Sequence, residues 1–184
     1  MQIKDLSPRE VYRYFSDIVA IPHGSGNTDA IAEYCVNFAK SHGYKYDRDA
    51  SNNVIIYAPG TPGYENSNPV ILQGHLDMVC EKKPDCQINM ENDGLEVCTD
   101  GINVWAIGTT LGGDDGIAVA FILAILDSND IPHPPIEALL TADEEIGMLG
   151  ARAVDCSKLT AKAMINIDSE EDYNLVVGCV PVKA

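Results

Sequence analysis

Short runs of apolar residues alternate with longer amphipathic segments along the chain, a pattern typical of α/β proteins. Three of the runs are too short for helices and are rich in β-branched and aliphatic residues, which predicts strands buried on both faces of a sheet. They lie at residues 70–72, 136–141 and 163–167. Buried strands of this kind are typical of parallel sheets, so we expect the three to belong to one central sheet.

Helical spacing of apolar residues marks several of the segments around these strands. Ser7-Pro8 is a typical helix start, and an amphipathic pattern follows it until Ile21-Pro22 ends the helix. A second amphipathic helix is expected over residues 28–43. Residues 117–126 are apolar nearly all round, which predicts a helix packed inside the protein, and a short helix is expected at 149–154.

Weaker patterns predict the remaining strands. Four short stretches are expected to pair two by two, residues 46–49 with 54–57 and residues 97–99 with 102–105. The second pair flanks Asp100-Gly101, a preferred dipeptide for a tight hairpin turn. A last strand is expected at 175–177. Together these elements predict an α/β fold in which helices cover both faces of a mixed, mostly parallel sheet.

Composition and charge narrow the class of protein. The 184 residues are enough for one domain with a full core, and contents of 46% hydrophobic and 22% charged residues are ordinary for a globular protein. The net charge of −16 argues against nucleic acid and anionic membranes as partners. We find no signal peptide, no transmembrane stretch and no C-x-x-C pair among the six cysteines, so we expect a cytoplasmic protein with reduced thiols.

Acidic residues and one histidine stand where the buried strands end. The first buried strand leads to His75, the second to Glu144-Glu145 and the third to Asp168. A glycine-rich loop brings Asp114-Asp115 to the start of the internal helix. Ligands of open α/β sheets bind beyond the carboxyl ends of the strands, so we expect these side chains to converge there.

Each of these residues also has an ordinary structural explanation. A lone histidine after a strand is often part of the packing, Asp114 can cap a helix, and Glu144-Glu145 can face a helix dipole. Together, however, so many carboxylates at one edge would repel and raise one another's pKa values. A bound cation removes this repulsion, and one imidazole with several carboxylates suits Zn²⁺, with Mn²⁺ or Co²⁺ as substitutes. The number of carboxylates favours two metals that share a bridging ligand.

Four motifs carry a resemblance to a known family. They are HLDMV at 75–79, LGGDDG at 111–116, TADEEIGM at 141–148 and NIDSEE at 166–171. In this order and spacing they resemble the motifs of metallopeptidase family M20. Within that family the chain is similar to the aminoacyl-histidine dipeptidases, the Xaa-His dipeptidase or peptidase D branch. The resemblance implies the three-layer α/β/α fold of the zinc peptidases, with a central mixed, mostly parallel sheet.

The resemblance also implies a role for each residue of the site. His75 and Asp168 would hold one zinc ion, Glu145 would hold the other, and Asp114 would bridge both. Glu144 would be the general base.

Two further implications concern the surroundings of these residues. Asp77, counted with the catalytic residues, would hydrogen-bond the far nitrogen of His75, which fixes its tautomer and strengthens it as a ligand. A cis peptide bond would follow Asp114.

The implied activity is metal-dependent hydrolysis of dipeptides of the Xaa-His type, such as carnosine. A metal-bridged water would attack the peptide carbonyl, with Glu144 as the base. Two Zn²⁺ ions are implied as cofactors, a small peptide as substrate and a homodimer as the full-length assembly. The alternatives are another M20 amide hydrolase, such as a tripeptidase or an N-acyl amino-acid deacylase, and a metal-binding module without catalysis. Loss of Glu144 would favour the last, and Glu144 is in place.

The chain also departs from the family pattern. The second zinc of the family takes a histidine from late in the full-length protein, and the histidines other than His75 match no such motif here. The family's separate lid domain has no counterpart either. We therefore expect residues 1–184 to be the N-terminal segment of a dizinc catalytic domain. Alone, it should bind at most one metal tightly, show negligible activity and self-associate through an open strand edge.

Overall fold

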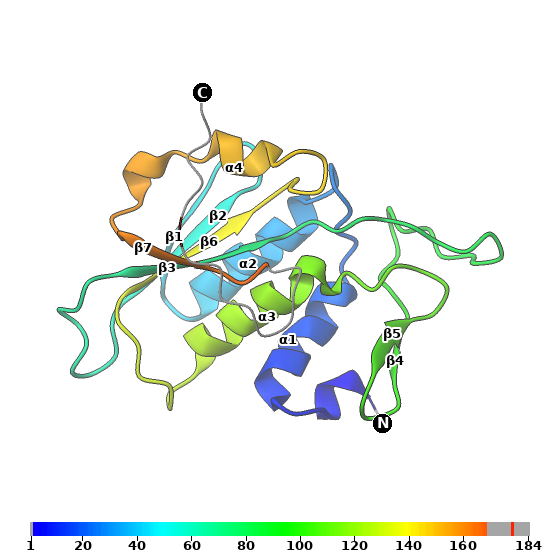
Figure 1. Ribbon diagram of the computed structural model, residues 1–184, viewed down its shortest axis with the longest axis horizontal. Coiled ribbons are helices and arrows are strands. Elements are labelled where there is room, and N and C mark those ends of the chain that lie inside the picture. The colour runs from blue at the N-terminus through cyan, green and yellow to red at the C-terminus, as the bar shows by residue number, and fades with distance from the viewer. Residues whose placement is uncertain (1, 169–177, 179–184) are drawn as a thin grey trace.

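A five-stranded sheet forms the centre of the molecule, which is a computed structural model that describes residues 2–168 and 178 (Figure 1). The strand order is β1-β2-β6-β3-β7. The strands are β1 (Lys45–Arg48), β2 (Val54–Ala58), β3 (Val70–His75), β6 (Ile136–Thr141) and β7 (Ala163–Asn166). The three strands predicted from the apolar runs are thus β3, β6 and β7, and they lie side by side. The predicted burial is wrong for β7, whose residues are all exposed, because this strand lies at the edge of the sheet and pairs only with β3 in the described residues.

The sheet is mixed, as predicted. Strand β3 runs parallel to both β6 and β7, whereas β2 runs antiparallel to both β6 and β1. Four of the five strands therefore point in the same direction. The register pairs His75 with Thr141, so the carboxyl ends of β3 and β6 lie level with each other.

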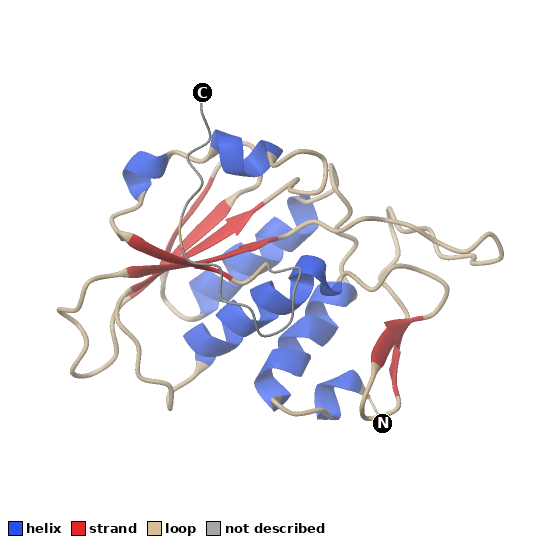
Figure 2. Ribbon diagram, viewed as in Figure 1, coloured by secondary structure: helices blue, strands red, loops and turns tan. Residues whose placement is uncertain are grey.

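Helices cover both faces of this sheet, as expected for three layers (Figures 1 and 2). Three of them, α1 (Arg9–Val19), α2 (Asp29–Ser41) and α3 (Gly113–Asp127), lie on one face. The other face carries the shorter α4 (Leu149–Ala153). The 3-10 turn η1 (Ile3–Asp5) precedes α1, and η2 (Cys156–Lys158) leads from α4 towards β7.

Alternating strand residues explain how the two faces are filled, because successive side chains of a strand point to opposite sides. The main core joins the three long helices to one set of strand residues, Val54, Ile56, Leu72, Ala138 and Leu140. The intervening residues Ile55, Ile71 and Leu139 form a small second core with Val154, Leu159 and Ala161. All six residues of β6 are buried because both of its faces are covered. The internal helix predicted at 117–126 is confirmed as part of α3.

Two local predictions need correction. The strands β4 (Val97–Thr99) and β5 (Val104–Ala106) do form a hairpin, but the predicted two-residue turn at Asp100-Gly101 is wrong. Thr99 pairs with Val104, so four residues form the loop, and the carboxylate of Asp100 accepts the backbone N–H groups of the two residues before Val104. A side chain that satisfies two loop donors makes the longer turn stable.

The first long helix begins one residue later than predicted. Pro8 is the N-cap residue of α1, and no side chain caps the helix. The strand predicted at 175–177 lies outside the described residues. Among the helices of the described part of the chain, none has the length and apolar character needed to cross a membrane.

Candidate metal centre

Three of the four predicted metal ligands meet beyond the carboxyl ends of β3 and β7. His75 is the last residue of β3, Asp114 lies at the entrance to α3, and Asp168 follows β7. One donor atom from each lies within 4.8 Å of the other two. His75 Nε2 is 3.1 Å from Asp114 Oδ1. Such a spacing allows one cation to contact all three side chains, and the donor set is one that zinc accepts.

The imidazole of His75 is buried and held from two sides. Its side chain is 1% exposed, and its backbone N–H donates to Asp115 Oδ2 at 2.9 Å. Nδ1 lies 2.9 Å from the backbone carbonyl oxygen of Asp77, which can only accept, so Nδ1 carries a proton. The nearer carboxylate oxygen of Asp77 is 3.4 Å away. The residue predicted to orient His75 does contact it, although the carbonyl is closer than the carboxylate.

The carboxylate of Asp77 forms its shortest hydrogen bonds with a different part of the chain. It accepts the hydroxyl of Ser25 at 2.7 Å and the backbone N–H groups of Glu144 at 2.9 Å and Glu145 at 3.3 Å. Burial raises the pKa of Asp77, but the hydrogen bonds from His75, Ser25 and Glu144 outweigh it and lower the pKa to about 2. Asp77 is therefore an anion that joins the end of β3 to the loop after β6.

Electrostatics at His75 favour positive charge. Burial lowers the pKa of this imidazole, whereas the carboxylates of Asp77, Asp115 and Asp114 raise it, and the net result is about 9. Without a metal the ring is therefore protonated at neutral pH. A cation that binds Nε2 has to displace this proton, and it finds the same surrounding carboxylates. The site thus fits a metal ion by its charge as well as by its donor atoms.

Asp115 is a residue of the site that sequence reasoning left without a role. Its side chain accepts the backbone N–H of His75 and the residue is 3% exposed, whereas the side chain of its neighbour Asp114 is 71% exposed. Burial raises the pKa of the Asp115 carboxyl to about 7. The feature of the sequence that could have identified Asp115 is the pair of adjacent aspartates between glycines at the start of an apolar helix. The peptide bond between Asp114 and Asp115 is cis, as predicted.

Glu144 and Glu145 lie on the loop between β6 and α4. Glu144 Oε2 is 4.0 Å from His75 Nε2, and its side chain is 25% exposed. Glu145 does not belong to the group of three metal donors in the described residues. Partial burial, followed by the negative charge of Asp114, raises the pKa of Glu145. The two adjacent carboxylates thus occupy different surroundings beside the same histidine.

Known dipeptidases have similar sequences. Over 178 residues, the chain is 42% identical to the cytosol non-specific dipeptidase of Escherichia coli (strain K12). The match covers 97% of this chain and 37% of that relative. This chain is a homologue of that dipeptidase. It spans little more than a third of the length of this relative.

Solved structures agree with this assignment. The aminoacylhistidine dipeptidase from Vibrio alginolyticus superposes on this dipeptidase homologue with a TM-score of 0.90 and 43% sequence identity. That match covers 94% of this chain and 35% of the Vibrio chain. A tripeptidase from Staphylococcus aureus matches with a TM-score of 0.75 at 22% identity, over 91% of this chain and 45% of its own, which shows a shared fold. No protein-family model matches the chain.

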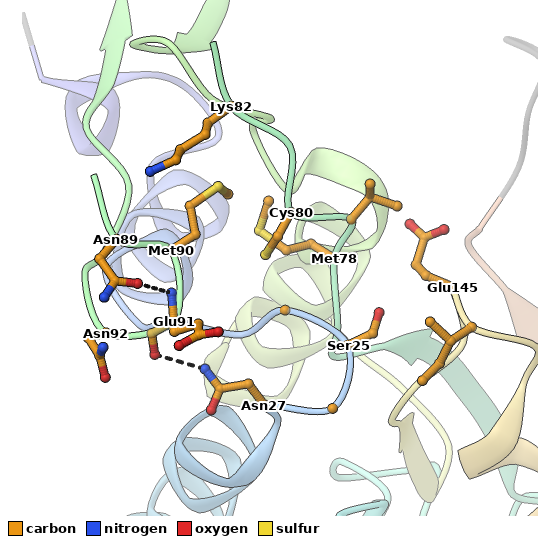
Figure 3. Close-up of a pocket in the computed structure, with 14 residues that line it drawn as sticks. Ser25, Asn27, Met78, Cys80, Lys82, Asn89, Met90, Glu91, Asn92 and Glu145 are labelled. Carbon is orange, nitrogen blue, oxygen red and sulfur yellow. Dashed lines mark hydrogen bonds between the residues drawn. The ribbon is translucent and has the colours of Figure 1, made fainter. Parts of the chain in front are cut away.

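A cavity of about 1020 Å³ opens beside the metal centre of this dipeptidase homologue (Figure 3). Its walls come from residues 24–27, the segment after β3, residues 89–92 and Glu145 with Ile146. Figure 3 shows Glu145 on one side of the cavity and Asn89 and Asn92 on the opposite side. Because Glu145 also lies beside the metal donors, a molecule in this cavity would be next to the metal centre.

Proposed function

We propose that the chain is the N-terminal segment of the catalytic domain of a zinc-dependent dipeptidase that cleaves Xaa-His dipeptides of the carnosine type. The observation that carries this proposal is the convergence of His75, Asp114 and Asp168 with the carboxylate of Glu144 beside them. Similarity to two dipeptidases at 42% and 43% identity supports it. The lid domain and the rest of the catalytic domain would be supplied by the longer, full-length protein.

The residues present suit two zinc ions unequally. His75, Asp114 and Asp168 would hold one ion, and Asp114 with Glu145 would contribute to the second. Two carboxylates without an imidazole make a weak zinc site, so we propose that the second ion takes a further ligand from elsewhere in the full-length protein. When bound, the two ions lower the pKa of a water molecule and stabilise negative charge on the carbonyl oxygen of the substrate.

The chain's own residues provide the proton transfer. The Glu144 carboxylate accepts a proton from the attacking water and returns it to the leaving amine. Asp77 keeps this base in place through its carboxylate, which accepts the N–H of Glu144, and its backbone carbonyl accepts the Nδ1 proton of His75, so one buried residue positions both groups. Because Glu144 is only partly exposed, few water molecules compete for its carboxylate.

The cavity beside Glu145 is the proposed binding place for the peptide. The wall of this cavity combines Met78, Val79 and Met90 with polar groups that include the amides of Asn27 and Asn89, so a peptide there would meet both apolar side chains and hydrogen-bonding groups. We further propose a homodimer as the full-length assembly. The name of the Escherichia coli relative contains "cytosol", which supports a cytoplasmic location.

Hydrolysis of carnosine by the full-length protein tests this function. Matched substrates are Xaa-His dipeptides, dipeptides without histidine, tripeptides and N-acyl amino acids, each measured with and without a chelator. We expect chelator-sensitive cleavage of Xaa-His dipeptides. Faster cleavage of tripeptides or N-acyl amino acids would instead identify another M20 amide hydrolase. Zinc binding without any hydrolysis would identify a metal-binding protein that is not a peptidase.

A further inference from the structure

The loop that carries Glu144 and Glu145 is attached to the fold by side chains from outside it. It runs from Ala142 at the end of β6 to Gly150 in α4. In its middle, Asp77 accepts the N–H groups of both glutamates, and the Asp143 carboxylate accepts the N–H of Gly26 at 2.7 Å. At its base, Gly150 N–H donates to the carbonyl of Ala142 at 3.0 Å, which closes the loop.

A single buried amide completes the base of this loop. The Asn53 side chain, on the turn before β2, accepts the N–H of Ala142 at 3.0 Å and donates to the carbonyl of Gly150 at 2.9 Å. The residue is 2% exposed. An amide has both an acceptor and a donor, so it satisfies one backbone group at each end of the loop at once. No residue with only one of these functions could bridge the two ends in the same way.

The orientation of this amide is fixed by its own turn. Asp49 Oδ2 accepts the remaining Nδ2 proton of Asn53 at 2.7 Å, and Asp49 Oδ1 accepts the backbone N–H of Asn53 at 3.0 Å. Space at the loop base is also closed, because a Cβ atom at Gly150 would overlap the carbonyl oxygen of Ala142. The Asn53 amide therefore has one orientation, and the loop ends have little room to move.

We infer that Asn53 is a positioning residue for Glu144, acting from the opposite end of the loop to Asp77. This inference rests on the proposed role of Glu144 as the base. Asn53 touches neither the metal donors nor the cavity wall in the described residues, so its effect on the reaction passes through the loop. Without it, Ala142 N–H and Gly150 C=O would be buried without partners, and the loop base would have to open to reach water.

Amide hydrogen exchange on the full-length protein tests the structural half of this inference. In Asn53→Ala we expect residues 142–150 to exchange about tenfold faster or more, while β3 keeps its protection. The matched control is Asn52→Gly, a neighbouring asparagine whose hydrogen bonds go to Arg48 and Thr28 and whose positive φ glycine accommodates. Unchanged exchange of the loop in Asn53→Ala would contradict the inference, whatever the activity of the protein.

Kinetics test the functional half. Asn53→Ala should lower kcat for an Xaa-His dipeptide by about 10- to 100-fold, with KM and zinc content nearly unchanged, since misplaced catalytic groups reduce turnover. In a Glu144→Gln background the same change should have no further effect, because the group that Asn53 positions is already inactive. A residue that only stabilises the fold would lower the melting temperature and leave kcat unchanged at temperatures where the protein is folded.

Three further results distinguish a failure of the inference about Asn53 from a failure of the proposed role of Glu144. An equal loss of kcat in both backgrounds would show that Asn53 does not act through Glu144. Wild-type turnover of Glu144→Gln would overturn the proposed base, while the exchange experiment would still decide whether Asn53 holds the loop. Asn53→Asp keeps the oxygen that accepts from Ala142 and loses the donor to Gly150, so it should alter the loop in the same direction. If neither variant folds, Asn53 is a stability residue and the inference is wrong.

Discussion

Two neighbouring parts of the candidate metal centre are built in different ways. The segment from His75 to Asp77 ends the central strand β3, and both side chains are buried against the core. The loop with Glu144 and Glu145 lies at the surface and is held through its backbone by Asp77 and Asn53, and through the Asp143 carboxylate by the N–H of Gly26. The core thus fixes the proposed metal ligand His75, whereas a few hydrogen bonds fix the proposed base Glu144. Substitutions far from the candidate metal centre should therefore reduce proton transfer more than they reduce metal binding.

Glu144→Gln should separate the two parts most clearly. The variant keeps the N–H that Asp77 accepts and removes only the group that carries the proton, so kcat should fall by about 10²- to 10⁴-fold. Zinc binding by His75, Asp114 and Asp168 should stay as in the wild type, which calorimetric titration measures. Turnover near the wild-type value would mean that another residue is the base.

Asp77→Ala should affect both parts because this carboxylate contacts both. Loss of such an orienting partner typically reduces metal affinity or activity by about 10- to 100-fold. We expect kcat to remain low even at a zinc concentration that fills the metal sites. The reason is that the N–H groups of Glu144 and Glu145 lose their acceptor. Full recovery of kcat with added zinc would show that Asp77 acts through His75 alone.

Gly150→Ala should disturb the loop without removing any polar group. The new methyl group overlaps the carbonyl of Ala142, and overpacking of this kind typically costs about 1–3 kcal/mol of unfolding free energy. Gly113→Ala is the control, because a Cβ atom at that position would meet only the side chain of Leu111, at an ordinary contact distance of 3.7 Å. Denaturant unfolding compares the two variants, and we expect Gly150→Ala to be the less stable. A more stable Gly150→Ala would show that the loop base yields easily.

Zinc binding should also depend on pH. In the metal-free site the pKa of His75 is raised to about 9, so below this pH zinc has to displace a proton. Affinity should therefore fall about tenfold for each pH unit between about pH 8 and pH 6, and one proton should be released per zinc. Calorimetry in buffers of different ionisation enthalpy measures the proton release. An affinity independent of pH would contradict a His75 ligand whose pKa is raised in the metal-free site.

The sequence was sufficient to predict the central strands and their ends. Continuous apolar runs predict strands or internal helices, and the polar residues that follow such strands lie where the strands end, which located His75 and Asp168. Burial was predicted correctly for β6 but not for the edge strand β7, because the sequence does not show which strand lies at the edge of the sheet. Asn53 could not be found in this way, because its partners Ala142 and Gly150 lie far away in the sequence. The length of the β4–β5 turn was missed because the carboxylate of Asp100 stabilises a longer loop than Asp-Gly alone predicts.

The register between β3 and β6 allows the connection between these strands to change in length without moving the candidate site. Because His75 lies opposite Thr141, backbone hydrogen bonds between two buried strands set the distance from the histidine to the glutamate loop. The length of the connection between these strands does not enter that distance. Residues 80–107, with the β4–β5 hairpin, can therefore gain or lose segments while the donor atoms keep their places. The same fold could in this way acquire new peptide preferences over evolution without rebuilding its reaction centre.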